Sequence, residues 1–226
     1  MKTVKQYRHL LIAAGYGVFY LTCFHYLEQR VTRGYHLIHT PLDDMIPFCE
    51  FFVIPYLMWF GYIAWAIFYF GICNKNKKEY YQLIFNLGIG MTLFLVISYL
   101  YPNGQNLRPT EFPRSNVFTG LVQYVYGIDT PTNIFPSIHV YNSVAVATAV
   151  EKSEKFRKRP VIRKISTALA ILIILSTMFL KQHSVSDVCC ALVMNAGTYM
   201  LLYHQPGEHA ARPIKGKKKE KVQIHI

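Results

Sequence analysis

Charged residues are scarce in this chain of 226 residues. Asp, Glu, Lys and Arg together make up 16% of the sequence, whereas ordinary soluble domains contain about 25%. Hydrophobic residues make up 52% and aromatic residues 15%, including 17 Tyr and 15 Phe. This balance disfavours a soluble domain. It is typical of a chain whose outer surface faces lipid, with Tyr and Trp concentrated at the two interfaces.

Signatures of nucleotide, metal and redox sites are also absent from the sequence. There is no P-loop, no Rossmann glycine pattern and no metal-ligand spacing, so we expect neither a cofactor nor a metal. The cysteines form no C-x-x-C pair and lie in or beside apolar runs. We interpret them as small buried hydrophobic residues and leave open a Cys23–Cys49 disulfide on the outer side. The five are Cys23, Cys49, Cys73, Cys189 and Cys190.

The N-terminal region lacks the cleavage site of a secretory signal peptide. Lys2, Lys5 and Arg8 precede a long apolar stretch, but no A-x-A-like sequence follows it. We therefore predict that this stretch is retained as the first membrane-spanning helix.

Six apolar segments in all are predicted to be membrane-spanning helices. Crossing the hydrocarbon core takes about 20 helical residues, and a helix satisfies its own backbone polar groups within lipid. Segment 136–150 is short and 165–182 is marginal, but the loop charges require both. The fold class we predict is an all-α, six-helix polytopic membrane bundle. The segments are roughly 9–27, 50–73, 83–101, 136–150, 165–182 and 184–204.

The net charge of +12 is distributed unevenly among the connections. The connections 28–50 and 102–135 carry −2 and zero. With six spans, all basic connections fall on one side, which the positive-inside rule makes cytoplasmic. We therefore predict that both termini are cytoplasmic and that the protein lies in the cell membrane. The basic connections are 1–8 (+3), 74–80 (+2), 151–164 (+5) and 205–226 (+4).

Two parts of the chain are distinguished by composition. We predict a membrane domain over residues 1–204, with its catalytic half at about 83–204, and a disordered basic cytoplasmic tail over 205–226. A tail of this kind can bind anionic lipid head groups or nucleic acid. We interpret it as a stop and orientation signal, and we expect membrane lipids rather than nucleic acid as partners. The oligomeric state stays open.

The connection 102–135 is long for a compact domain, which indicates function or embedded structure. Apolar residues within 115–126 recur at helical spacing, so we predict a short amphipathic helix on the outer interface. In the earlier connection, Asp43 and Asp44 could bind a cation or a substrate hydroxyl. A solvated turn or a helix cap is the more common role of such a pair.

Three polar clusters lie at the predicted outer ends of the spans. The first surrounds Arg108, the second runs from Pro136 to His139, and the third runs from Lys181 to Asp187. Because the topology was drawn from charge alone, their placement on one membrane face is independent support for a single site.

The third cluster has the spacing of an activated histidine. His183 and Asp187 are four residues apart and share a helix face. The carboxylate can hold one imidazole nitrogen protonated and leave the other as a base or nucleophile. Asp187 stands in an apolar context, where ionisable residues usually have a function.

The other two clusters suit an anion. Ser137 is a plausible N-cap, and the N-terminus of a helix that opens at Pro136 attracts negative charge. Arg108 offers a planar fork that matches two phosphate oxygens. Together with His139, these groups predict a phosphoester whose apolar part stays in the bilayer.

These residues resemble the motifs of the type 2 phosphatidic acid phosphatase superfamily. Its motifs are Lys-x6-Arg-Pro, Pro-Ser-Gly-His and Ser-Arg-x5-His-x3-Asp, and the resemblance spans about residues 83–204. The matching residues are Arg108-Pro109, Pro136-Ser137 with His139, and Ser176, His183 and Asp187.

Three positions depart from those motifs. Tyr101 stands in place of Lys, Ile138 in place of Gly and Thr177 in place of Arg. Two phosphate-binding cations of the phosphatases are therefore missing. The reduced set resembles the branch that contains inositol-phosphoceramide and sphingomyelin synthases, and Lys181 could supply part of the lost charge.

The resemblance implies a metal-independent mechanism. His183 would attack phosphorus and form a phosphohistidine, while Asp187 orients it and stabilises its positive charge. His139 would protonate the leaving oxygen and then activate water or an alcohol. Arg108, Lys181 and the N–H groups near Ser137 would hold the phosphoryl oxygens.

Three functions follow, in the order in which we favour them. The first is hydrolysis of a lipid phosphate monoester at the outer membrane face. The second, which Tyr101 and Thr177 motivate, is transfer of an inositol-phosphate or phosphocholine type of head group between lipids. The third is a transporter or lipid-binding protein with a relict site, against which the clustering on one face argues.

Overall fold

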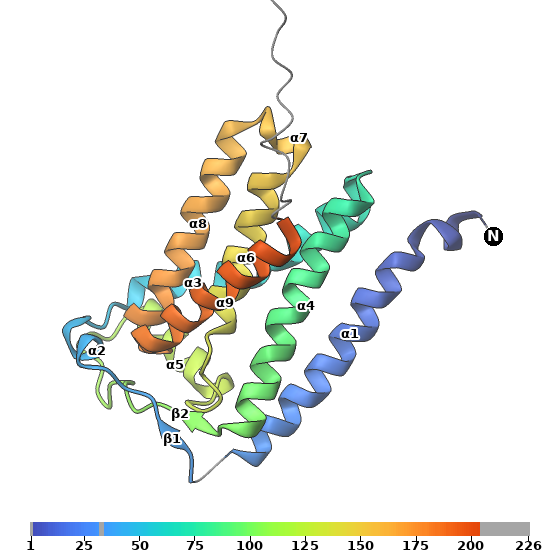
Figure 1. Ribbon diagram of the computed structural model, residues 1–226. Helices are drawn as coiled ribbons and strands as arrows, with labels where there is room; N and C mark the ends of the chain where they lie inside the picture. The colour runs from blue at the N-terminus through green and yellow to red at the C-terminus, as the bar shows by residue number, and fades with distance from the viewer. Residues whose placement is uncertain (1, 32–33, 204–226) are drawn as a thin grey trace, which may run out of the picture.

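The computed structural model describes residues 2–31 and 34–203. The predicted basic tail, 205–226, lies outside the described residues. The described chain is nearly all-α, as predicted (Figure 1). The long helices are α1 (Lys2–Arg30), α3 (Val53–Phe68), α4 (Lys77–Leu100), α6 (Ile138–Lys152), α8 (Pro160–Phe179) and α9 (Val185–Tyr203).

Shorter elements complete the chain. A 3-10 turn (Glu50–Phe52) precedes α3, and a π-helical turn (Tyr69–Cys73) follows it. The remaining elements are α2 (Pro41–Met45), α5 (Val117–Ile128), α7 (Glu154–Arg157) and the two-residue strands β1 (His36–Leu37) and β2 (Asn103–Gly104).

Five of the helical segments in the described part of the chain are long and apolar enough to cross a membrane. α6, the predicted fourth span, has 15 residues, which gives a length of about 22 Å against a hydrocarbon core of about 30 Å. The five segments are His9–Arg30, Glu50–Cys73, Lys77–Leu100, Pro160–Phe179 and Val185–Tyr203.

α6 is the central helix of the bundle. It packs against α3, α4, α8 and α9. Its approach to α4 is so close that a Cβ on Gly90 would lie 1.9 Å from a ring carbon of Tyr141. The Tyr141 hydroxyl in turn donates to the Asn86 side-chain oxygen at 2.8 Å and lies 2.9 Å from the Thr198 hydroxyl. A helix that is enclosed in this way needs little apolar outer surface, which explains its weak hydropathy signal.

The start of the third predicted span, residue 83, was placed too late. α4 begins at Lys77, where the Asn76 side chain accepts a hydrogen bond from the Lys78 N–H at 3.1 Å. The first turn of α4 is polar, so it does not have the apolar residues from which a membrane span is predicted. The predicted amphipathic helix over 115–126 is present as α5, with Val122 and Val125 buried.

The cysteine prediction was wrong in part. All five thiols are free, so the Cys23–Cys49 disulfide that was left open is not formed. Cys73 and Cys189 are exposed on the helix surface. An apolar neighbourhood does not imply burial in this chain, because the outer faces of its helices are apolar as well.

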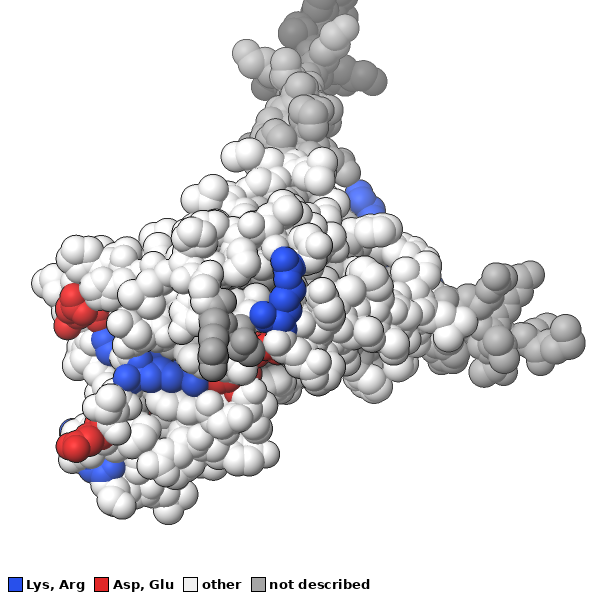
Figure 2. Space-filling model, turned by 90° about the horizontal axis from the view of Figure 1, so that it is seen from below, with Lys and Arg blue, Asp and Glu red and all other residues white. Residues whose placement is uncertain are grey.

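One end of the bundle gathers the connections that hold the candidate site. α1, α4 and α8 finish there, and α6 and α9 begin there (Figure 1). β1 pairs in parallel with β2, and Gly104 forms an antiparallel bridge with Thr132. Viewed from this end, basic and acidic side chains are few and lie among one another, so neither sign dominates (Figure 2).

Candidate active site

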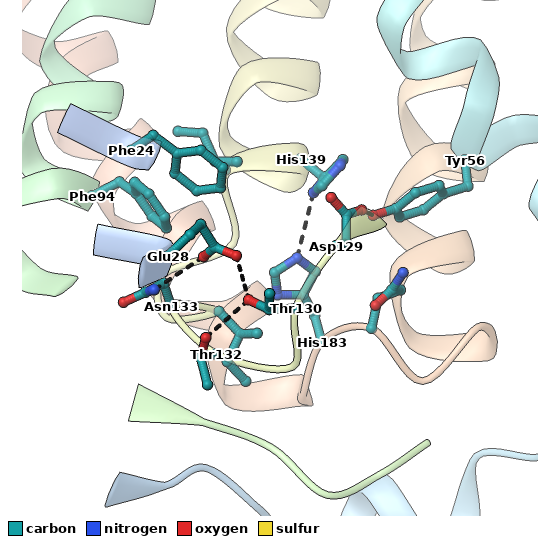
Figure 3. Close-up of a pocket in the computed structure, with 13 residues that line it drawn as sticks. Phe24, Glu28, Tyr56, Phe94, Asp129, Thr130, Thr132, Asn133, His139 and His183 are labelled. Atoms are coloured by element: carbon teal, nitrogen blue, oxygen red, sulfur yellow. Dashed lines mark hydrogen bonds between the residues drawn. The ribbon is translucent and has the colours of Figure 1, made fainter. Parts of the chain in front are cut away.

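A cavity at this end lies among α1, α3, α4, the start of α6 and the turn between α8 and α9 (Figure 3). Both histidines of the sequence motifs line it. Its walls combine aromatic rings, small polar groups and two carboxylates. The lining residues are Phe24, Glu28, Tyr56, Phe94, Asp129, Thr130, Thr132, Asn133, Ile134, Ile138, His139, Gln182 and His183.

His183 stands between a carboxylate and a second imidazole. Its Nδ1 lies 3.3 Å from Oδ2 of Asp187, and its Nε2 lies 3.4 Å from Nδ1 of His139 (Figure 3). Asp187 is fully buried in the first turn of α9, where it also accepts the Ser184 N–H at 2.9 Å. The structure thus brings together the three residues that were predicted to be catalytic.

The turn that carries His183 folds back onto the end of α8. The N–H groups of Gln182 and His183 donate to the carbonyl oxygen of Thr177, at 2.9 and 3.1 Å. Lys181 adopts a left-handed backbone conformation with φ of 54°. This reversal directs His183 toward α6 and lets α9 begin two residues later.

His139 is positioned by the first turn of α6. Ser137 caps this helix, and its hydroxyl accepts the Val140 N–H at 3.4 Å. The Ser137 N–H donates to the carbonyl oxygen of Asp187 at 3.3 Å, so it is occupied within the protein. The His139 ring lies against Tyr56 and Trp59, with centroid distances of 4.8 and 4.5 Å.

Arg108 does not line the cavity. Its guanidinium donates to the carbonyl oxygens of Tyr126, Asp129 and Thr130, and it stacks on the Tyr126 ring at 4.4 Å. Burial lowers the pKa of Arg108, while Tyr126 and Asp129 act in the opposite direction. One further bond, 2.6 Å long, runs to Oε1 of Gln182 and connects Arg108 with the cavity.

Lys181 and Asp43 bind each other beside the turn that carries His183. The Lys181 ammonium donates to the main-chain oxygen of Asp43 at 2.6 Å and does not line the cavity. The Asp43 carboxylate accepts the Ser184 hydroxyl at 2.6 Å and the Val185 N–H at 2.8 Å. Asp43 therefore caps α9 and fixes the turn that carries His183.

The comparison with protein families identifies the stretch that carries these residues. Residues 102–210 match the model of the PAP2 superfamily. This stretch belongs to the PAP2 superfamily. The match confirms the resemblance read from the motifs, and the superfamily consists generally of phosphatases and phosphotransferases that act on phosphate esters. No curated protein and no solved structure matches the chain.

Three residues at motif positions lie away from the cavity, two of them variant (Tyr101 and Thr177) and one matching (Ser176). Tyr101 is exposed and stacks on His36, with ring centroids 4.3 Å apart. Ser176 and Thr177 are buried in the last turns of α8, where their hydroxyls donate to main-chain oxygens of Ile173 and Ile174. Thr177 contributes to the site only through its carbonyl oxygen.

The alternatives left open for the acidic pair are resolved by the structure. Asp43 is a buried helix cap. The burial of Asp43 acts to raise its pKa, but hydrogen bonds from Ser184, Val185 and Thr40 outweigh it, so the pKa lies below its usual value. Asp44 is exposed and lies 2.9 Å from His39. The carboxylate of Asp43 is thus used within the protein.

Several residues that line the cavity were not predicted from the sequence. Gln182 precedes a motif histidine, so its position was a usable signal. Glu28 and Asp129 were counted only as loop charges, and no motif marks them. Glu28 and Tyr56 also lie outside the part of the chain that matches the PAP2 superfamily.

Proposed function

We propose that this protein is an integral membrane enzyme that cleaves a lipid phosphoester through a phosphohistidine at His183. The observation that carries the proposal is the array of Asp187, His183 and His139, with separations of 3.3 and 3.4 Å. A nucleophile flanked by an orienting acid and a second acid–base group is the arrangement that covalent catalysis requires.

The roles follow from the two nitrogens of each ring. Asp187 accepts the Nδ1 proton of His183, which leaves the Nε2 lone pair free to attack phosphorus. A protonated His139 gives its proton to the leaving oxygen as the P–O bond breaks. The neutral His139 then takes a proton from water or an alcohol, whose oxygen attacks the phosphohistidine. A positioned acid–base group of this kind contributes about 10²- to 10⁴-fold in rate.

Gln182 is the residue best suited to hold a phosphoryl oxygen. Its Oε1 accepts from Arg108, which orients the amide, while its buried Nε2 has no partner. We assign Arg108 to positioning Gln182, rather than to the direct phosphate contact that the motif implies. The predicted direct contacts of Lys181 and Ser137 receive no support from their geometry.

For the acceptor, hydrolysis of a lipid phosphate monoester is our first candidate; the PAP2 match supports a phosphatase or phosphotransferase acting on phosphate esters, and hydrolysis is the simpler of the two reactions. Head-group transfer between lipids is the second, and a specific observation favours it. No Lys or Arg is among the described residues that line the cavity, whereas Glu28 and Asp129 are. A dianionic monoester would meet two carboxylates there, and a phosphodiester carries one negative charge fewer.

For the membrane, we propose that α6 completes a six-pass path with both termini in the cytoplasm and the cavity on the outer face. The alternation of helix directions in Figure 1 and the basic connection 151–164 support this path. Reporter fusions after residue 35 and after residue 203 should give opposite sidedness. The same side for both would contradict the topology.

The enzymatic proposal is tested with purified protein and lipids labelled in the phosphate. We expect acid-labile label on the wild-type chain and none on His183→Ala. His25→Ala serves as the control because His25 is exposed on α1 and lies outside the cavity. Free phosphate would identify hydrolysis, and label in a second lipid would identify transfer. No label from any lipid phosphate would favour the transporter or lipid-binding alternative.

A further inference from the structure

Two adjoining hollows open on the surface of the bundle, away from the histidine cavity. The first lies among α6, α8 and α9, and the second lies along the first half of α8. They share Glu151, Thr167 and Ile171, so together they form one groove. The groove runs toward the end of the molecule at which α7 joins α6 to α8, opposite the end that holds the cavity (Figure 1).

The inner part of this groove is apolar. Val144 and Ala147 line it from α6, and Ile171 and Ile174 line it from α8. Lys152, at the outer end, lies eight residues beyond Val144 in α6, a distance of about 12 Å along the helix axis. One leaflet contributes about 15 Å of hydrocarbon to a bilayer. The apolar part of the groove therefore has the depth at which a lipid acyl chain lies.

The outer end of the groove carries three cations and one carboxylate. Arg163 pairs with Glu151, to which its Nε donates at 2.6 Å and a second N–H also donates. The Lys152 ammonium lies 5.1 Å from the centroid of the Tyr199 ring, which also lines the groove. In the described ranges, neither Lys152 nor Lys164 forms an ion pair. The outer end thus has two more positive charges than negative ones.

Two other hollows on the helix surfaces differ from this groove in charge. One lies between α3 and α8, beside Trp65, and the other lies between α1 and α4, beside Phe85. No charged side chain is among the described residues that line either of them. Hollows of that kind accept an acyl chain of any lipid, whereas the groove at Lys152 and Lys164 also distinguishes head groups by charge.

We propose that the groove is a binding site for an anionic glycerophospholipid of the surrounding bilayer. An acyl chain lies along Ala147 and Ile174, and Lys152 and Lys164 bind the phosphate. Basic pockets between membrane helices bind anionic head groups in this way. A zwitterionic head group binds less well, because its ammonium group meets the same lysines. The site goes beyond the proposed function, since none of its residues lines the histidine cavity.

The test measures thermal unfolding of the purified full-length protein in a non-ionic detergent with added lipid. Phosphatidylglycerol and phosphatidylcholine with identical acyl chains are compared, because a ligand that binds the folded state raises the unfolding midpoint. We expect phosphatidylglycerol to reach its half-maximal shift at a concentration about tenfold or more below that of phosphatidylcholine. Glycerol 3-phosphate, which has the phosphate but no acyl chain, should give no shift at the same concentrations.

Three variants locate the binding. Lys152→Gln and Lys164→Gln should each raise the half-saturating concentration of phosphatidylglycerol about fivefold, since one basic residue beside an anionic head group contributes about 1 kcal/mol. The double variant should raise it about 25-fold. Lys78→Gln is the matched control, because Lys78 is an exposed cation in the first turn of α4 at the same end and does not line the groove. It should leave the half-saturating concentration unchanged.

Three results would overturn the site. Equal half-saturating concentrations of the two lipids would show that head-group charge is not recognised. Equal effects of Lys78→Gln and Lys152→Gln would show attraction by the overall charge of this end. Equal shifts with glycerol 3-phosphate and phosphatidylglycerol would show a site for free phosphate. The lipid-free midpoint of each variant is its own reference, and lipid bound at the histidines affects all variants alike.

Discussion

The two sides of the cavity come from different parts of the chain. The reacting side, His139, His183 and Asp187, lies within the stretch that matches the PAP2 superfamily. The opposing wall includes Phe24, Glu28, Tyr56 and Phe94, all of which precede that stretch. The groups that we assign to chemistry therefore carry a family signature, whereas the groups that we assign to substrate choice carry none.

The sharpest test of this contrast is removal of the nucleophile. His183→Ala should lower kcat on every lipid by on the order of 10³-fold or more, since no other group takes over a covalent step. Thermal unfolding in detergent should change little. A variant that keeps a substantial rate on one lipid would show that the reacting side is not shared by all substrates.

Loss of the oriented amide should rank second. Gln182→Leu keeps the volume and removes the Nε2 donor, so we expect kcat to fall about 10²-fold, the usual cost of one oxyanion donor. Arg108→Lys should give a smaller loss of the same kind, because Arg108 orients the amide through Oε1. If Arg108→Lys cost more than Gln182→Leu, Arg108 would act on the substrate directly.

Asp43, which binds the turn that carries His183, should affect the stability of the protein more than its catalytic rate. Asp43→Asn weakens bonds to Ser184 and Val185, and we expect the free energy of unfolding to fall by about 1–3 kcal/mol. The exposed Asp44→Asn is the matched control and should change it by less than about 0.5 kcal/mol. Equal effects of the two would refute the capping role.

The same carboxylate predicts a pH dependence of stability. The folded-state pKa of Asp43 lies below its usual value because its hydrogen bonds outweigh burial. Its contribution is therefore fully present above the unfolded-state pKa and is lost as the pH falls through the lower folded-state pKa. Thermal midpoints measured down that acid range should drop more steeply in the wild type than in Asp43→Asn.

The smallest effect is expected at Lys181. Its ammonium donates to the Asp43 main-chain oxygen and does not line the cavity, so Lys181→Ala should lower kcat/KM by only a few-fold. Gln105→Ala offers a comparison, since Gln105 donates to the Lys181 carbonyl oxygen. A loss of 10²-fold in Lys181→Ala alone would restore the sequence-based hypothesis that Lys181 replaces a missing phosphate-binding cation.

Much of the helix pattern could be predicted because it depends on local properties. The apolar runs located α1, α3, α4, α8 and α9, and the spacing of Val122 and Val125 located α5. The predicted start of a helix was wrong where the first turn is polar, as at Lys77 in α4. The span at 136–150 was predicted from loop charge, and the structure has a 15-residue helix there, α6, which packs against four other helices.

In the candidate site, too, local features were predicted from the sequence and long-range contacts were not. Motif spacing was enough to select His139, His183 and Asp187, because residues four apart share a helix face and the topology gathers the helix ends. Motif spacing does not say where a long side chain points. Arg108 reaches carbonyl oxygens of the 126–130 segment and Lys181 reaches Asp43. These partners lie 18 or more residues away in the chain.

By itself the sequence determined a helical chain rich in apolar segments, a PAP2 signature and the identity of the paired histidines. Only the tertiary structure decided what surrounds them: that Asp43 caps α9, that Arg108 acts on Gln182, and that Glu28 enters the cavity. The physical reason is that hydropathy and spacing are local quantities. The charge balance of a cavity is the sum of side chains contributed by helices far apart in the chain.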